Sequence, residues 1–165
     1  MKDHSRIRSL GCACGLLGVA LVAAGQATSD GLSVRSIAEV ESRSVQAGRT
    51  VVKLVPADRV VPGDRVIYTL EVRNIGTTAL DAPVVSHPVP EHVRYVADSA
   101  LGPAAEVSYS VDGGKSFGRA ENLRVPTPEG SKPALAADYT DIRWQLKNPL
   151  KPNSVAFVRF RAVVK

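Results

Sequence analysis

A sixteen-residue stretch, V-P-G-D-R-V-I-Y-T-L-E-V-R-N-I-G at positions 61–76, constrains the fold of this chain more than any other feature. Its apolar and polar residues alternate from Val66 onward, which is the period of a β-strand with one buried face. A Pro-Gly-Asp turn precedes the strand and an Asn-Ile-Gly turn follows it, because Pro presets φ while Gly and Asn tolerate left-handed backbone. The stretch therefore predicts a strand that faces the core with Val66, Tyr68, Leu70 and Val72.

Further strand patterns recur at short intervals and are separated by turn residues. The earlier ones are predicted at residues 32–47, 50–56, 80–86 and 93–96. Residues 140–146 also alternate, with Trp144 on the inward side. In the last strand one register is unbroken and apolar, so we expect the core to receive Ala156, Val158, Phe160, Ala162 and Val164.

Helical patterns do not compete with this interpretation. No window of eleven or more residues after position 27 carries a convincing helical stripe, and Pro or Gly interrupts nearly every candidate. Residues 118–138 are rich in Pro and Gly and predict a long connection with a brief edge strand at 123–125. We therefore predict an all-β fold, an antiparallel β-sandwich of about 7–9 strands.

The first 27 residues have the layout of a secretory signal peptide. Basic residues come first, an apolar run follows, and small residues at Gly25 and Ala27 suit a signal peptidase. The alternative is a membrane anchor, but an apolar run of about 15 residues is shorter than the roughly 20 that span a bilayer. We expect cleavage near Ala27, which leaves a single domain over residues 28–165.

Cleavage would also remove both cysteines, because Cys12 and Cys14 lie within the predicted signal peptide. The mature chain would then have no thiol or disulfide and would depend on its hydrophobic core. Its formal charge would be +3, since the 21 basic and 16 acidic residues fall to 18 and 15. These charges are spread singly along the strands, so we expect no nucleic-acid binding, which needs a basic stripe with exposed aromatic residues.

The order of turns and strands is similar to that of a known family. The pattern P-G-D-x-V-x-Y-x-L-x-V-x-N-x-G, then Pro88-Val89-Pro90, a strand with Trp144 and a last strand after Leu150-Lys151-Pro152 resembles the bacterial and archaeal surface-protein repeat called domain of unknown function eleven. The resemblance covers roughly residues 51–165. Family members often have Asp where this chain has His87 and Gly where it has Asn153. The resemblance implies an immunoglobulin-like sandwich in an exported protein, without an established activity.

The sharpest local motif is S-V-D-G-G-K-S-F at positions 110–117. It is similar to the Asp-box, a hairpin motif of sialidase propellers, in which an Asp carboxylate accepts backbone N–H groups and Gly supplies unusual φ values. A propeller would carry several copies, and this chain carries one. We therefore interpret residues 110–117 as a structural hairpin, with only a faint indication of glycans.

No catalytic, cofactor-binding or metal-binding residues are predicted. The group His87, Glu91 and His92 contains possible zinc ligands, but two prolines extend the stretch and zinc needs three or four converging ligands, so we interpret both histidines as loop residues. Six aspartates are expected at turns and lack the spacing of a calcium loop, namely Asp58, Asp64, Asp98, Asp112, Asp138 and Asp141. No nucleophile elbow or phosphate-binding glycine loop is present.

These patterns predict a non-catalytic module of the cell envelope or surface, with a structural or partner-binding role. Its partner would be an envelope protein or a surface polymer, its mature form soluble and not membrane-spanning, and its location the periplasm, the cell surface or the medium. The alternative is a glycan-binding module of the envelope, and a hydrolase comes third. Exposed aromatic rings would favour the glycan-binding alternative. We expect any partner to contact an edge strand or the connection at residues 118–138.

Overall fold

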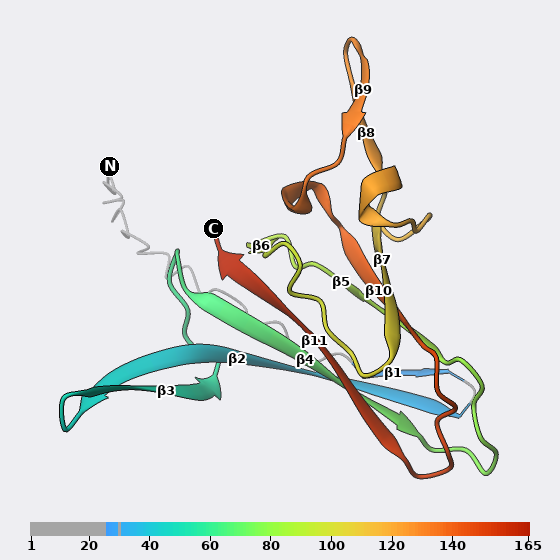
Figure 1. Cartoon of the computed structure of the whole chain (residues 1–165), viewed down its shortest axis with the longest axis horizontal. Coiled ribbons are helices and arrows are strands. Elements are labelled where there is room, and N and C mark those ends of the chain that lie inside the picture. Colours follow the sequence, from blue (N-terminus) through green and yellow to red (C-terminus); the bar gives the residue numbers. More distant parts are fainter. Residues whose placement is uncertain (1–25, 30) are drawn as a thin grey trace, which may run out of the picture.

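The structure is a computed structural model that describes residues 26–29 and 31–165 (Figure 1). Apart from Gln26 and Ala27, the predicted signal peptide lies outside the described residues. The described chain contains strands and two short 3₁₀ turns, so the prediction of an all-β fold is confirmed. Within the described residues, no helix is long and apolar enough to cross a membrane.

The larger sheet has six antiparallel strands. They run in the order β1-β2-β4-β11-β6, and β3 pairs with β2. Their bounds are β1 Gln26–Ser29, β2 Leu32–Gln46, β3 Arg49–Pro56, β4 Arg65–Asn74, β6 Val93–Tyr95 and β11 Val155–Val164. Strands β4 and β11 are the centre of this sheet, because each is paired along most of its length.

The smaller sheet has three antiparallel strands in the order β5-β10-β7. Its central strand β10 spans Asp141–Leu146, between β5 (Val84–Pro88) and β7 (Ala105–Ser110). The two sheets pack against each other through their apolar faces, as in a β-sandwich. Trp144 of β10 lies with its ring 6.2 Å from that of Phe160 in β11, and Phe160 stacks on Tyr68 of β4 at 4.9 Å.

The predicted inward faces of the main strands are confirmed. Trp144, Phe160 and Leu70 are completely buried, and most other predicted inward residues of β4, β10 and β11 join the same core cluster. Ile67 is an exception, because it lies on the opposite face of β4 and is buried as well. Its direct neighbours on that face are Glu39 and Arg161, whose long aliphatic stems can cover it.

Two predicted elements differ from the structure. The strand expected at residues 80–86 begins only at Val84, because Ala82 adopts a positive φ of 45° and Leu80 makes an isolated bridge to Leu150. The connection at 118–138 contains a separate hairpin instead of a single edge strand, formed by β8 (Arg124–Thr127) and β9 (Gly130–Pro133). The 3₁₀ turns η1 (Ala120–Asn122) and η2 (Ala136–Asp138) flank this hairpin.

Strands β2 and β3 extend beyond the rest of the larger sheet. Residues 32–40 of β2 pair with β4, whereas residues 39–46 pair with β3. A two-residue turn with positive φ at Ala47 and Gly48 joins the two strands, as in the tight hairpins that match strand twist. Residues 41–56 therefore form a projecting two-stranded hairpin, called the arm below (Figure 1).

Candidate functional site

The predicted hairpin at residues 110–117 is present and is held by its own side chains. Asp112 accepts hydrogen bonds from the Ser116 backbone N–H at 3.0 Å and from the Ser116 hydroxyl at 2.6 Å. The Ser110 hydroxyl donates to Asp112 at 2.7 Å. These hydrogen bonds, led by that of Ser116, hold the pKa of Asp112 well below its usual range. The prediction of a carboxylate-centred turn is confirmed.

This turn closes one end of the smaller sheet. Tyr109 and Gly118 exchange two backbone hydrogen bonds of 2.9 Å across it, and the Gly113 N–H donates to the Thr140 hydroxyl at 3.0 Å, just before β10. Gly113 and Gly114 both have positive φ, which explains their place in the motif. The motif thus sets the point at which the chain leaves β7 and starts the connection at 118–138.

Beyond this closure, the outer edge of β7 is unpaired within the described part of the chain. Backbone groups along a strand point alternately to its two sides. The backbone of Tyr109 bonds to Gly118 on the side away from β10, whereas the carbonyl of Ala104 accepts from Lys147 on the side of β10. The N–H and C=O groups of Ala105 and Val107 must therefore point outward, away from β10. Among the described residues, no strand pairs with β7 on that side. β7 therefore presents a short edge that another chain could extend.

The unpaired edge opens into a surface depression with a volume of about 420 Å³. Strand β7 forms one wall and the start of the connection forms the other, with lining residues that include Ala105, Glu106, Val107, Arg119, Ala120 and Glu121. An ion pair of 3.3 Å joins Arg119 to Glu106 across the depression. Both side chains are well exposed, so this contact is weak and can open for a ligand.

A cluster of three tyrosines supports this wall from behind. The Tyr109 ring stacks on Tyr139 at 4.4 Å, and its hydroxyl lies 3.1 Å from that of Tyr95. Burial raises the pKa of Tyr109, and the hydrogen bond to Tyr95 raises it further. Burial also raises the pKa of Tyr139, so the hydroxyls of Tyr109 and Tyr139 stay neutral at physiological pH. The three positions are far apart in the sequence, and no local signal indicates that they meet.

The group His87, Glu91 and His92 does not converge. His87 lies on β5, not in a loop as predicted, and its ring lies beside Phe160 at 5.7 Å and Tyr68 at 6.0 Å. Burial lowers its pKa. Glu91 and His92 are exposed in the following bend. In the described part of the chain, no group of three or more His, Cys, Asp or Glu residues could hold a metal ion.

Several of the predicted turn aspartates do bind backbone N–H groups. Asp64 accepts from Val61 at 2.9 Å, and Asp138 accepts from Leu135 at 2.8 Å. Asp98 has a positive φ of 57°, which is also typical of a turn position. The carboxylates of Asp64 and Asp138 are therefore used in local structure.

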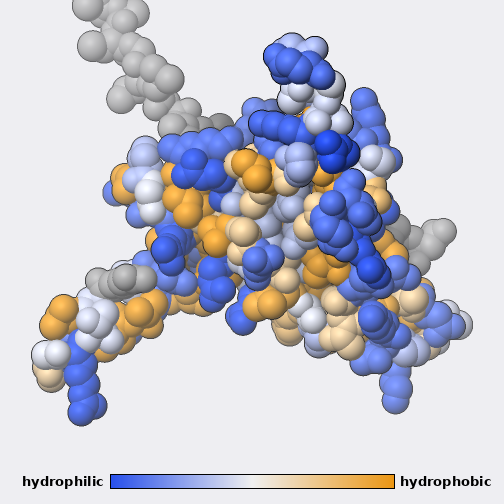
Figure 2. Space-filling model, turned by 45° about the horizontal axis from the view of Figure 1, so that its top comes forward, coloured by the Kyte–Doolittle hydropathy of each residue, from blue (hydrophilic) through white to orange (hydrophobic). Residues whose placement is uncertain are grey.

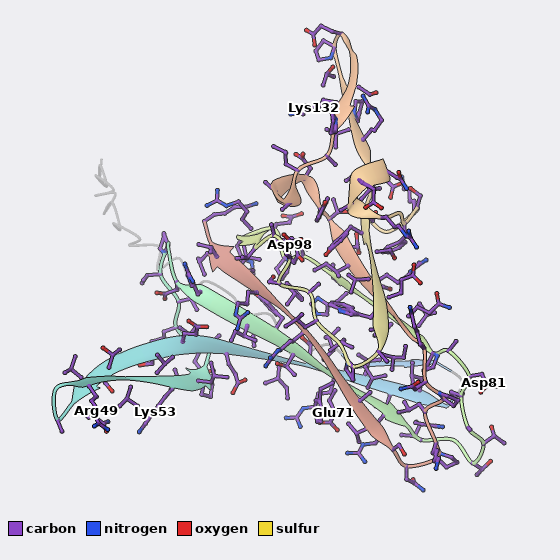
Figure 3. All side chains as sticks on the ribbon, in the orientation of Figure 1. Arg49, Lys53, Glu71, Asp81, Asp98 and Lys132 are labelled. Carbon is purple, nitrogen blue, oxygen red and sulfur yellow. The ribbon has the colours of Figure 1, made fainter. Side chains whose placement is uncertain are left out.

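The features that meet at one place are the Asp112 turn, the edge of β7 and the start of the connection at 118–138. The hairpin β8–β9 projects beyond them with Lys132 on its second strand (Figure 3). The arrangement offers backbone donors and acceptors beside a depression with both charge signs, which suits an extended peptide. No family model, curated protein or solved structure matches this chain.

Proposed function

We propose that this protein is an exported, non-catalytic immunoglobulin-like module of the cell envelope or surface, and that it binds an extended segment of an envelope protein along β7. The observation that carries the proposal is the outward backbone of Ala105 and Val107 beside the depression. A peptide placed there would continue the smaller sheet as a fourth strand and set its side chains in the depression.

In contrast to β7, the other edge of the smaller sheet, formed by β5, is protected. The outward positions of β5 include Pro88, which has no N–H to donate, and Pro83 and Pro90 flank the strand. Proteins shield sheet edges with proline to prevent unwanted pairing. The contrast between the two edges favours β7 as the side used for binding.

Export and membership of an immunoglobulin-like class rest on the sequence pattern and on one backbone feature. The signal-like first 27 residues support export. Asn153, which stands where the resembled family often has Gly, has a positive φ of 61°, a conformation that Gly and Asn adopt most readily. This departure from the family pattern is therefore compatible with the same turn.

The glycan-binding alternative has little support among the aromatic side chains. Sugar platforms need flat exposed rings, and of the eight aromatic residues, all of them described, only Phe157 is highly exposed, at 53%. Phe117 is covered by the Arg143 guanidinium, which lies 3.5 Å from the ring centroid. A single phenylalanine on the outer face of the larger sheet favours a protein partner over a sugar.

The proposal is tested by residue-specific amide hydrogen exchange with a panel of short synthetic peptides that carry each class of side chain at alternate positions. We expect at least one peptide to slow exchange at Ala105 and Val107, because the added strand would pair with their N–H groups. No change at these amides with any peptide of the panel at millimolar concentration would overturn the proposal.

Two matched variants sharpen this experiment. Ala120→Trp places an indole in the depression without touching the core, and should weaken peptide binding at least tenfold by steric exclusion. Ala137→Trp is the control, because Ala137 is an exposed alanine of the second 3₁₀ turn and does not line the depression. Equal binding by both variants would show that the depression is not the site.

A further inference from the structure

The arm is a part of the fold that neither the core nor the β7 edge explains. Its two strands pair only with each other beyond Val40, and β3 pairs with no strand except β2 among the described residues. A two-stranded hairpin without a covering layer is marginally stable in water. This geometry favours a further contact that the described residues of the chain do not provide.

One face of the arm exposes three large apolar side chains to solvent, beside Glu41, which pairs with Leu54 on the same face. It continues the outer face of the larger sheet and carries Val45, Val52 and Leu54, which are 75%, 51% and 46% exposed. Figure 2 shows hydrophobic colouring along the arm as it projects from the body. Exposed apolar residues that gather on one element are typical of interaction surfaces.

Within residues 26–29 and 31–165, the outer edge of β3 is also unpaired, and the geometry of the turn at Ala47 and Gly48 determines which backbone groups point to that edge. In a hairpin with a two-residue turn, Gln46 and Arg49 form a hydrogen-bonded pair, and such pairs recur at every second position. Residues 51, 53 and 55 therefore bond inward to β2, in line with the bond from Ala57 to Ala38. The N–H and C=O groups of Thr50, Val52 and Leu54 point outward.

We propose that this edge binds a second copy of the same chain, with the two β3 strands antiparallel about a two-fold axis at Val52. In this register Val52 pairs with its own copy, and Thr50 pairs with Leu54 at both ends. All the free backbone groups of Thr50, Val52 and Leu54 then receive partners. The exposed side chains of Val52 in the two copies then lie next to each other on the same face.

The neighbouring registers are disfavoured by specific residues. A shift by two positions toward the end of β3 would place Lys53 opposite its own copy and Thr50 opposite Pro56, which has no N–H. The opposite shift would leave Leu54 beside the turn at Gly48. In the register centred on Val52, Lys53 lies opposite Val51 instead. Figure 3 shows Lys53 and Arg49 along the arm, away from the body.

A symmetric pairing of this kind also limits itself. Each copy uses the same edge, so the dimer leaves no free β3 edge for a third copy and does not grow into a fibre. Strand β3 is rich in Val and Leu, and Lys53 is its only charged residue after Arg49. Self-pairing explains why such a strand lies at a sheet edge without further charged or proline residues to prevent aggregation. The dimer would leave the β7 edge free, so this inference does not depend on the proposed function.

The test is sedimentation equilibrium of the full chain over a wide range of concentration, combined with amide exchange. We expect a monomer–dimer equilibrium, in which exchange at Thr50, Val52 and Leu54 slows as the dimer forms. Val52→Pro removes one N–H from each copy and therefore both of the hydrogen bonds that Val52 makes with its own copy at the axis. Since one hydrogen bond is worth roughly a factor of five in an equilibrium constant, dimerisation should weaken by about 30-fold.

A matched pair of charge variants tests whether the contact is made by the edge of β3 or by the exposed face of the arm in general. Val52→Lys places two ammonium groups opposite each other at the axis and should weaken the dimer by at least about tenfold. Val45→Lys makes the same change on the same face, but on β2 and away from the edge, and should leave the dimer nearly unchanged. The inference is overturned by a chain that stays monomeric throughout, or by a dimer that forms without slower exchange at Val52.

Discussion

Asn74, the last residue of β4, offers the sharpest test of the structure. It is fully buried, and its side chain makes three hydrogen bonds. The amide Nδ2 donates to the carbonyls of Thr78 and Leu150, both at 2.8 Å, and Oδ1 accepts from the Gly76 N–H at 2.9 Å. One side chain thus joins the end of β4 to the turn that follows it and to the segment before β11.

Asn74→Ala should reduce the free energy of unfolding by about 3–5 kcal/mol. Each of the three hydrogen bonds contributes roughly 1 kcal/mol, and the backbone groups left without a partner in a buried site add to the loss. Small domains are stable by about 5–15 kcal/mol in total. The variant should therefore unfold at a clearly lower urea concentration, with a similar dependence on urea.

Asn74→Asp distinguishes the hydrogen-bond geometry from simple packing. An oxygen replaces Nδ2 and faces two carbonyl oxygens, so the ionised carboxylate is disfavoured in the folded protein and its pKa is raised. The folded variant then binds a proton more tightly than the unfolded one. Its stability should therefore increase relative to the wild type as the pH falls from neutral toward the ordinary range of a carboxyl group.

Urea unfolding of the wild type and both variants at several pH values measures these effects. Asn122→Asp is the control, because Asn122 is exposed in η1 and undergoes the same change of charge. An Asn74→Asp variant as stable as the wild type at neutral pH would refute the reasoning. A stability loss that is independent of pH would refute the assigned donor and acceptor roles.

The remaining predictions concern the core, the Asp112 turn and export. Trp144→Ala should cost roughly 3–5 kcal/mol of unfolding free energy. Trp144→Phe should cost less, because the indole Nε1 has no hydrogen-bond partner among the described residues. Red-shifted tryptophan fluorescence of the native protein would contradict this burial. Asp112→Asn should lower the melting temperature at neutral pH. The difference in melting temperature from the wild type should shrink as the pH falls below the usual carboxyl range, because the pKa of Asp112 is depressed in the folded protein. A difference that does not change with pH would argue against the turn geometry. Mass spectrometry of exported protein should find a mature N-terminus near Thr28, whereas an intact Met1 on membrane-bound protein would disprove cleavage.

The prediction of strand faces succeeded where the signal is local. Period-two alternation in β4, β10 and β11 depends only on residues that are neighbours in the chain, so the inward positions of Trp144 and Phe160 could be predicted directly. The turn around Asp112 was predictable for the same reason, since its donors and acceptor all lie within a few residues. The connection at 118–138 was predicted as a connection, but its internal hairpin was not.

The candidate sites could not be predicted in the same way. The burial of Asn74 depends on the Leu150 carbonyl, 76 residues away in the chain, so the sequence indicated only a turn residue. His87 seemed a loop histidine until β5 placed it beside Phe160. The depression beside β7 needs the chain to return past it at Arg119, and no periodic pattern encodes that path.

By itself, the sequence determined the all-β class, the spacing of the strands and the face that each main strand turns to the core, because side-chain alternation and turn residues act over short distances. Only the tertiary structure decided which strand edges stay unpaired. Residues 49–56 have the pattern of an ordinary strand. They project as part of an arm because β2 continues beyond Val40, where its pairing with β4 ends. Strand order and the free edges of β3 and β7 depend on long-range backbone pairing, which involves the same N–H and C=O groups in every residue except proline and therefore leaves little trace in the sequence.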